Sequence, residues 1–291
     1  MDYLRQVQRG IDHIEANLER TLELRDVSRV AGISHWHFQR IFKALTGETL
    51  KTYVRSRRLA NALDLLLTTD TRILDIALRS GFESQESFTR AFKRSFGVTP
   101  NRYRKLGDRS LFLKKVRFDA DYLRHINHNV SLVPELVERP AMVLVGVCTR
   151  VYGVDSDKNN IGAELPALWA SFLPRLAEIE GCIPGVCYGV IQPAQSEGEL
   201  LEYDAAVQVP ADMDLPPPAG MRRIELPARR VATFTHTGFA RDIDRTVNYI
   251  YSTWLAQAEL RHTYGPDLEI YGSRWRADAE DSVMHYAIPV A

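Results

Sequence analysis

The chain has 291 residues, which is enough for about two domains, each with a core of its own. Apolar residues make up 45% and charged residues 25%, and this balance excludes a disordered tail or a fibre. No apolar stretch reaches the roughly 18 residues of a membrane span, and the start, MDYLRQVQRG, lacks the apolar core of a signal peptide. We therefore expect a cytoplasmic protein without a membrane segment. Cys148, Cys182 and Cys187 lack CxxC spacing, so we predict neither a disulfide framework nor a structural zinc site.

The formal net charge of zero hides an uneven distribution. Residues 1–110 carry 20 Lys and Arg against 13 Asp and Glu, whereas residues 111–291 carry 17 against 24. A basic half attracts polyanions, and an acidic half is compatible with cationic or neutral ligands. The alternative is that the halves are two solvated surfaces of opposite sign that attract each other.

Residues 1–110 are predicted to be helical almost throughout. A first helix shows apolar residues at helical spacing from Val7 to Leu18. A short amphipathic helix then ends at Gly32, and Ser34 caps a new helix with a polar outer face. A short helix, a glycine turn and an exposed polar helix are typical of a helix-turn-helix motif.

The same pattern returns 50 residues later, so the module is duplicated. SHWHFQRIFKALTGET (34–49) and SQESFTRAFKRSFGVT (84–99) share Phe, Arg, Lys and Gly in one register. Between the copies, Thr49 is predicted to cap a helix that runs to about Leu67. Such a helix spans about 25–30 Å, the length needed to hold two reading helices about one DNA turn apart.

The polar faces of these helices carry candidate DNA contacts. Arginine pairs with guanine, glutamine with adenine or phosphate, and tryptophan offers apolar surface to thymine methyl groups. Other cations would meet phosphates and make affinity fall with salt. A solvated surface charge is the alternative for any single cation, but it does not explain a duplicated set. The residues predicted on these grounds are Trp36, Gln39, Arg40, Lys43, Arg55, Arg57, Arg58, Gln85, Arg90 and Lys93.

FQRIFKALTG, together with GFESQESFTRAFKRSFGVTPNRYR, closely resembles the DNA-binding domain of AraC/XylS-type transcription regulators over residues 3–108. The resemblance implies seven helices, two helix-turn-helix units in successive major grooves, and regulation through contact with RNA polymerase. By position, the first reading helix would use Trp36, Gln39 and Arg40, and the second Gln85, Thr89 and Arg90. Glu86 would add a negative charge near the phosphates. The N-terminal place of the domain resembles the Rob-like subgroup.

Residues 111–130 show no clear period and are predicted to link the domains. Residues 131–291 then show the order strand, helix, strand, strand, which recurs after a proline-rich loop at 216–218. We predict paired antiparallel sheets with both helices on one side and a groove at the pseudo-twofold axis. The fold class is therefore an all-α N-terminal domain (1–110) followed by an α+β domain (131–291).

Aromatic residues are dense in the predicted groove, although core packing is their usual role. Glu269 is different, because it alternates with Tyr271 on a strand and should share its face. A carboxylate in an aromatic pocket needs a cation, a hydrogen-bond donor or a proton. A cationic, apolar ligand would meet this need. The alternative is a glutamate at a solvated strand end.

The doubled order and the segments ELPARRVATFTHTG and PDLEIYGSRW resemble the GyrI-like effector-binding domains over residues 132–291. The resemblance implies that Glu269 points into a ligand cavity. No P-loop, dinucleotide or HExxH motif is present, so we expect no cofactor and no metal. The predicted ligand-binding residues are Glu269, Tyr271, Tyr188, Tyr203, Trp169 and Phe234.

These patterns predict a sequence-specific DNA-binding transcription regulator, an activator, whose acidic domain binds a small cationic or lipophilic effector. Its expected partners are double-stranded DNA, the effector and RNA polymerase. We do not expect an enzyme. Two alternatives are a hydrolase in which Glu269 activates water beside Tyr271, and a module that docks another protein.

Overall fold

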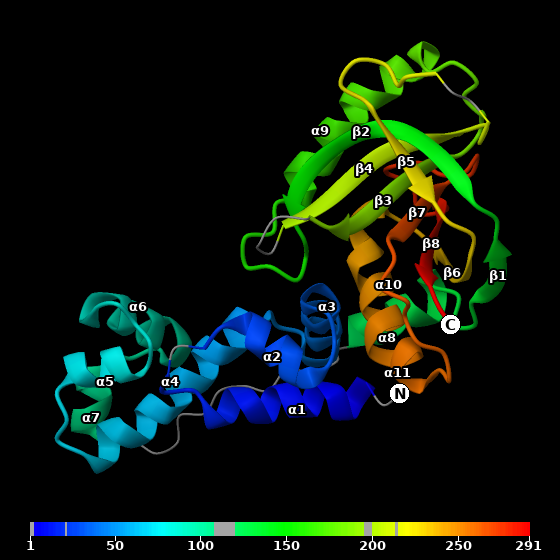
Figure 1. The fold of residues 1–291 in the computed structure, drawn as a ribbon. Helices are drawn as coiled ribbons and strands as arrows, with labels where there is room; N and C mark the ends of the chain where they lie inside the picture. The colour runs from blue at the N-terminus through cyan, green and yellow to red at the C-terminus, as the bar shows by residue number, and fades with distance from the viewer. Residues whose placement is uncertain (1–2, 21, 108–119, 195–199, 213–214) are drawn as a thin grey trace. The chain divides into compact units, whose positions relative to one another are not determined.

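The computed structural model describes residues 3–20, 22–107, 120–194, 200–212 and 215–291. These residues form two compact units, one within residues 3–107 and the other from residue 120 onward (Figure 1). Within the described ranges, no helix is both long enough and apolar enough to cross a membrane.

The first unit contains seven helices within residues 3–107, as the family resemblance implied. Two short helices, α2 and α5, each precede a longer helix, α3 or α6, and so form two helix-turn-helix motifs. The bounds are α1 Tyr3–Ala16, α2 Leu24–Ala31, α3 His35–Thr46, α4 Leu50–Thr68, α5 Ile73–Arg79, α6 Gln85–Phe96 and α7 Pro100–Leu106.

The two turns are built from the same residue types. Gly32 and Gly81 have φ angles of 71° and 72°, a left-handed conformation that glycine adopts without steric cost. Ser34 and Ser84 then cap α3 and α6 by accepting hydrogen bonds from backbone N–H groups in the first turn. The predicted glycine turn and serine cap of the first motif are therefore confirmed, and the second motif has the same two features.

Matching phenylalanines hold each motif in its core. Phe38 and Phe42 of α3 are fully buried, and so are Phe88 and Phe92 at the equivalent positions of α6. Within each helix the two rings lie 5.6–5.9 Å apart. The sequence repeat therefore produces the same core packing in both motifs.

Helix α4 connects the two motifs (Figure 1). Thr49 caps it, as predicted, through a 3.1 Å hydrogen bond from the Thr52 backbone N–H to Thr49 Oγ1. Its 19 residues span about 28 Å. Leu59, Leu63 and Leu66 are buried along its inner side.

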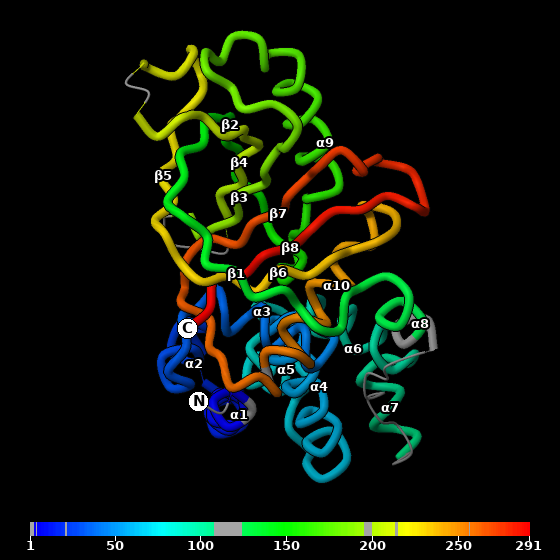
Figure 2. Tube along the Cα trace, turned by 90° about the vertical axis from the view of Figure 1, so that its right-hand side faces the viewer, coloured from blue at the N-terminus to red at the C-terminus, as the bar shows by residue number. Residues whose placement is uncertain are grey.

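The second unit is built on one antiparallel sheet of eight strands, in the order β1-β6-β8-β7-β3-β4-β2-β5 (Figure 2). Its strands are β1 Glu135–Arg139, β2 Met142–Tyr152, β3 Cys187–Pro193, β4 Leu200–Val209, β5 Arg222–Leu226, β6 Arg229–Thr237, β7 Asp267–Tyr271 and β8 Val283–Pro289. Its helical segments are α8 Ala120–Asn129, α9 Ile161–Phe172, η1 Leu173–Glu178, η2 Ala240–Asp242, α10 Ile243–Tyr249, η3 Ile250–Trp254 and α11 Leu255–Gln257.

Two repeats of strand, helix, strand, strand make up this unit, and they meet where β3 pairs with β7. The two repeats therefore share one continuous sheet instead of forming two. Trp169 of α9 contacts Tyr203 of β4, and Thr246 of α10 contacts His236 of β6. Tyr203 and His236 lie on the same face of the sheet, so both helices cover one side, as predicted.

Each repeat also has a leading strand that the sequence pattern did not separate. β1 precedes β2 but pairs with β6, and β5 precedes β6 but pairs with β2. The joining segments are similar, since Pro140-Ala141 follows β1 and Pro227-Ala228 follows β5. β5 was not predicted, because it has five residues and three of them are charged.

Both predicted helices are less regular than their apolar spacing suggested. The first changes from α9 to a 3₁₀ segment at Leu173, where Pro174 cannot donate a backbone hydrogen bond. The second changes from α10 to a π-helical turn over Ile250–Trp254. Such turns often occur at functional sites.

The predicted linker 111–130 contains helix α8, while residues 111–119 lie outside the described residues. His125 of α8 is buried, and its Nε2 lies 3.0 Å from Thr246 Oγ1. Thr246 Oγ1 also lies 2.7 Å from His236 Nδ1, and His236 Nε2 faces the Phe239 carbonyl oxygen at 3.2 Å. Because that carbonyl only accepts, His236 Nε2–H donates to it, Thr246 donates to His236, and His125 donates to Thr246. This chain of hydrogen bonds joins α8 to the sheet.

These hydrogen bonds also predict how the stability of the second unit responds to acid. Burial, and then the charges of His236 and Arg245, lower the pKa of His125 to about 4, although Asp242 opposes them. The unfolded chain therefore takes up this proton first, near pH 6.5. The stability contributed by neutral His125 is complete above pH 6.5 and is lost as the pH falls towards 4. His125→Gln keeps an N–H donor without titrating, so it should lose less stability between pH 7 and 4.5 in urea unfolding. The exposed His128→Gln is the matched control and should behave as wild type.

Candidate functional site

Helix α3 carries the first set of predicted DNA contacts on one side. All four residues, Trp36, Gln39, Arg40 and Lys43, lie on α3, and Arg40 is four residues from Trp36 and three from Lys43. Trp36, Gln39 and Arg40 are buried and Lys43 is half-buried, so the predicted exposure of this polar face is corrected. The Arg40 guanidinium lies 5.1 Å from the centre of the Trp36 ring, which is a cation–π distance. The stacking holds the planar donor groups of Arg40 in a defined orientation.

Helix α6 carries the equivalent set. Glu86 in its first turn is exposed, and hydrogen bonds from its own backbone N–H and from Ser84 lower its pKa, so this negative charge persists beside the predicted contacts. Gln85, Arg90 and Lys93 are exposed on α6, and Thr89 is half-buried.

The arginines of α4 differ from one another. Arg55 is exposed. Arg57, which we predicted to contact phosphate, instead donates from Nε and Nη2 to the Glu15 carboxylate of α1 at 2.8 and 3.0 Å. Its hydrogen bond lowers the pKa of Glu15, and Tyr53 donates to the same carboxylate. Arg57 therefore joins α4 to α1, and the prediction for it is corrected. The prediction for Arg58 is corrected as well, because its guanidinium donates to two backbone carbonyl groups.

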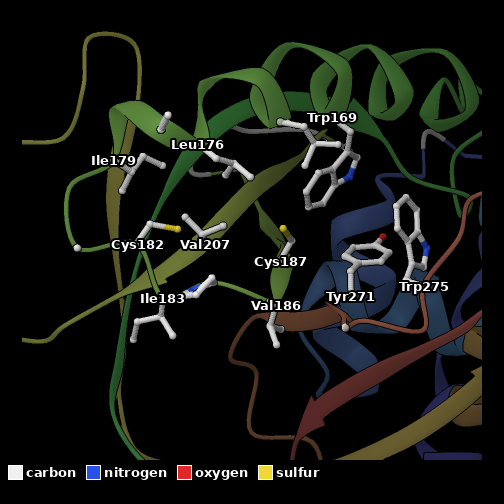
Figure 3. A pocket seen from close by; sticks show the side chains of 16 residues that line it. Trp169, Leu176, Ile179, Cys182, Ile183, Val186, Cys187, Val207, Tyr271 and Trp275 are labelled. Atoms are coloured by element: carbon white, nitrogen blue, oxygen red, sulfur yellow. The ribbon is translucent and has the colours of Figure 1, made fainter.

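The second unit contains an apolar cavity of about 700 Å³ (Figure 3). Trp169, Tyr271 and Trp275 stand together at one end, whereas Cys182 and Ile183 lie at the other. The Tyr271 ring centre lies 5.1 Å from that of Trp169 and 5.1 Å from that of Trp275, and both contacts are edge-on. We refer to these three residues as the aromatic wall.

A buried carboxylate lies behind the aromatic wall. Glu269 is only 6% exposed, and its Oε2 accepts hydrogen bonds of 2.6 Å from the hydroxyls of both Tyr203 and Tyr271. Trp169 Nε1 donates to the Tyr203 hydroxyl at 3.2 Å. Burial, and then the charge of Glu269, raise the pKa of both tyrosines well above 10. Both hydroxyls therefore stay protonated and keep donating.

The bond between Tyr203 and Glu269 depends on Gly189, which pairs with Glu269 across β3 and β7. A Cβ atom at Gly189 would lie 2.2 Å from the Tyr203 hydroxyl and 2.8 Å from Glu269 Oε2. The missing side chain thus leaves the space in which the tyrosine reaches the carboxylate.

Two of the predicted ligand residues lie elsewhere. Tyr188 pairs with Ile270, so its side chain leaves the face of the sheet opposite Glu269 and packs against an apolar cluster there. Phe234 is on the correct face but packs under the helix of the second repeat, 5.0 Å from Trp254. Neither residue lines the cavity, and both predictions are corrected. Glu269 and Tyr203 lie behind the aromatic wall and do not line the cavity either, so the expectation that Glu269 points into it is also corrected.

Sequence reasoning missed other features of this face. Trp275 joins the wall because β7 ends at Tyr271 and a turn follows, with a hydrogen bond from the Trp275 N–H to the Gly272 carbonyl. Asp267 is fully buried and accepts from the hydroxyls of Tyr251 and Tyr286. Neither a turn nor a buried aspartate produces a periodic signal.

Comparison with known proteins agrees with both halves of this description. A family model described as "Helix-turn-helix domain" matches residues 27–106, and one described as "GyrI-like small molecule binding domain" matches residues 133–291. The "Right origin-binding protein" of Escherichia coli (strain K12) is 30% identical over 275 residues, which cover 92% of this chain and 90% of that protein. This chain is an AraC-family transcription regulator with a GyrI-like domain.

Two further relatives of this AraC-family regulator differ in how much of the chain they match. The "Transcriptional regulator Rob" of Salmonella typhimurium is 29% identical over 262 residues, which cover 89% of this chain and 87% of that protein. The "Multiple antibiotic resistance protein MarA" of E. coli (strain K12) is 40% identical over 118 residues, which cover 40% of this chain and 87% of that protein. The match to Rob therefore extends over both units of this chain, whereas the match to MarA has about the length of one unit.

The two arginines of α4 in this AraC-family regulator give opposite expectations. Arg55→Ala should reduce the slope of log affinity against log salt by about one if Arg55 makes the predicted phosphate contact. Arg57→Ala should leave that slope unchanged and destabilise the protein by about 0.5–1 kcal/mol, since its partner Glu15 is partly exposed to solvent. DNA titrations at several salt concentrations, together with urea unfolding, measure both effects. An unchanged slope in Arg55→Ala would contradict the assignment of Arg55.

Proposed function

We propose that the cavity of this transcription regulator binds an aromatic, lipophilic cation. The observation that carries this proposal is the aromatic wall, whose central ring is hydrogen bonded to a buried carboxylate. An apolar cavity of about 700 Å³ is of the size that drug-sized ligands occupy.

The carboxylate acts on the ligand through Tyr271. Glu269 does not line the cavity, whereas Tyr271 does, and the Tyr271 hydroxyl donates to Glu269. A hydrogen bond to a carboxylate makes the tyrosine ring more electron-rich. A cation against this ring therefore gains both from the ring and from the negative charge behind it. The Tyr203 hydroxyl fixes the same carboxylate oxygen from the other side.

The DNA contacts are proposed to divide into two kinds. Arg40 and Gln39 of α3, and Arg90 and Gln85 of α6, would read base edges in two successive major grooves. The preceding tryptophan on α3 and Thr89 on α6 would support them through apolar and hydroxyl contacts. Lys43, Lys93 and Arg55 would contact phosphates. The matching serine caps of α3 and α6 support this division, and the side chains of the second set are the more exposed of the two sets.

Occupation of the cavity would then change transcription, with this protein as an activator that contacts RNA polymerase. The relatives are named as regulators, which supports sensing over catalysis. In addition, Glu269 is not among the residues that line the cavity, which supports sensing over general-base catalysis. We therefore expect the effector to be released unchanged.

Glu269→Gln tests the role of the charge. The amide keeps the size and a carbonyl acceptor but removes the charge, so binding of a tetraphenylphosphonium probe should weaken about tenfold in calorimetry. Binding of neutral triphenylphosphine oxide should change much less. Tyr271→Phe should resemble Glu269→Gln, and Tyr188→Phe on the opposite face is the matched control. Equal losses for the charged and the neutral probe would refute a charge-based site.

Arg40→Ala and Arg90→Ala test the two reading helices. Each should cost about 1–3 kcal/mol at a specific site and relax the base preference there, because a bidentate guanine contact is lost. Base preference is measured by binding selection from a random DNA library. Arg276→Ala, which removes an exposed arginine of the other unit, should leave the preference unchanged. If Arg40→Ala kept the wild-type preference, α3 would not read DNA in the proposed way.

A further inference from the structure

Two arginines face each other near one edge of the sheet, on the side away from the aromatic wall. Arg139 of β1 and Arg229 of β6 are Cα partners in the antiparallel register, so their side chains leave the same face. Both are half-buried. Like charges placed directly opposite each other destabilise a strand pair. The pair is therefore unfavourable unless an anion accompanies it.

The internal repeat shows that this position does not require arginine. Arg139-Pro140-Ala141-Met142 is the counterpart of Leu226-Pro227-Ala228-Arg229, because β1 pairs with β6 as β5 pairs with β2. The pair equivalent to the two arginines is thus Met142 with Leu226. These residues are only 6% and 3% exposed. One repeat buries an apolar pair where the other places two charges.

Among the residues that the structure describes, no acidic group neutralises the pair. Within the described ranges, neither arginine side chain forms a hydrogen bond or an ion pair, and Arg139 Nε is buried without an acceptor. Glu135 lies on the same face of β1 but bonds to neither arginine. Burial, and then the charge of Arg229, lower the pKa of Arg139, which is the response of a cation without a counter-ion.

Tyr188 adds a third donor at this place. It packs against the apolar cluster that contains Met142 and Leu226. Burial raises the pKa of Tyr188, while the nearby charge of Arg139 opposes the rise. Within the part of the chain that the structure describes, the Tyr188 hydroxyl has no hydrogen-bond partner. Arg139 is thus close to both the Arg229 guanidinium and Tyr188, and none of these three side chains has an acceptor among the described residues.

The second arginine extends over Gly265. A Cβ atom at Gly265 would lie 1.5 Å from Arg229 Nη1, so the guanidinium occupies the space that a side chain would fill. The direction of Arg229 therefore depends on a neighbouring loop.

We propose that Arg139, Arg229 and Tyr188 form a binding site for a phosphate-type oxyanion, separate from the effector cavity. A guanidinium donates two parallel hydrogen bonds to an oxyanion. Two such forks and a hydroxyl offer more donors than the two oxygens of a carboxylate can use, whereas a tetrahedral phosphate accepts from all three groups. The source is either free phosphate or the phosphate ester of a metabolite.

Thermal unfolding of the full chain tests this site. Millimolar inorganic phosphate should raise the Tm of the wild type by about 2–4 °C above sodium chloride of equal ionic strength. Arg139→Leu with Arg229→Met reproduces the apolar pair of the other repeat, so this double variant should fold and lose the phosphate-specific rise. Arg230→Met, which removes a neighbouring exposed arginine on the other face, should keep the rise.

Further measurements identify the source of the phosphate group and test the position of the Arg229 guanidinium. Glycerol phosphate that acts as well as phosphate would indicate an ester ligand, and phosphate acting alone would indicate the free ion. Gly265→Ala displaces the Arg229 guanidinium without removing charge and should reduce the rise. The proposal is overturned if the double variant keeps the rise, since phosphate would then bind elsewhere, or if the wild type shows none. An equal rise with acetate would also overturn the preference for a tetrahedral anion.

Discussion

The effector cavity depends on the requirement that a buried carboxylate be hydrogen bonded. Glu269 meets it with two tyrosyl hydroxyls that come from different strands, Tyr203 from β4 and Tyr271 from β7. This requirement explains Gly189, whose missing side chain gives Tyr203 its path. It also fixes the orientation of the central ring of the aromatic wall. The chemistry of the cavity is therefore determined one layer below its surface.

Both units of the chain are duplications, but the copies are related in different ways. In the first unit, α4 separates two helix-turn-helix motifs, and each motif has its own buried phenylalanines. In the second unit, the copies share one sheet and meet at β3 and β7. The first arrangement repeats one surface at a distance, whereas the second creates a site from residues of both copies.

Local signals in the sequence predicted much of this structure. Glycine turns, serine and threonine caps and helical spacing located the helices of the first unit, because each signal acts within a few residues. The cavity was only partly predictable. Glu269 and Tyr271 alternate on one strand, but the faces of Tyr188 and Phe234 follow from pairing with distant strands. The prediction for Arg57 was wrong for the same reason, since its partner Glu15 lies on another helix.

The exchange of β1 and β5 gives the second unit the connectivity of a domain-swapped dimer whose two subunits have been joined end to end. Each copy completes its edge with a strand borrowed from the other, so a single copy would expose an unpaired edge and lack part of its core. We therefore expect both copies to fold together, and to fold slowly, because the pairing of β1 with β6 joins segments 90–98 residues apart in the chain.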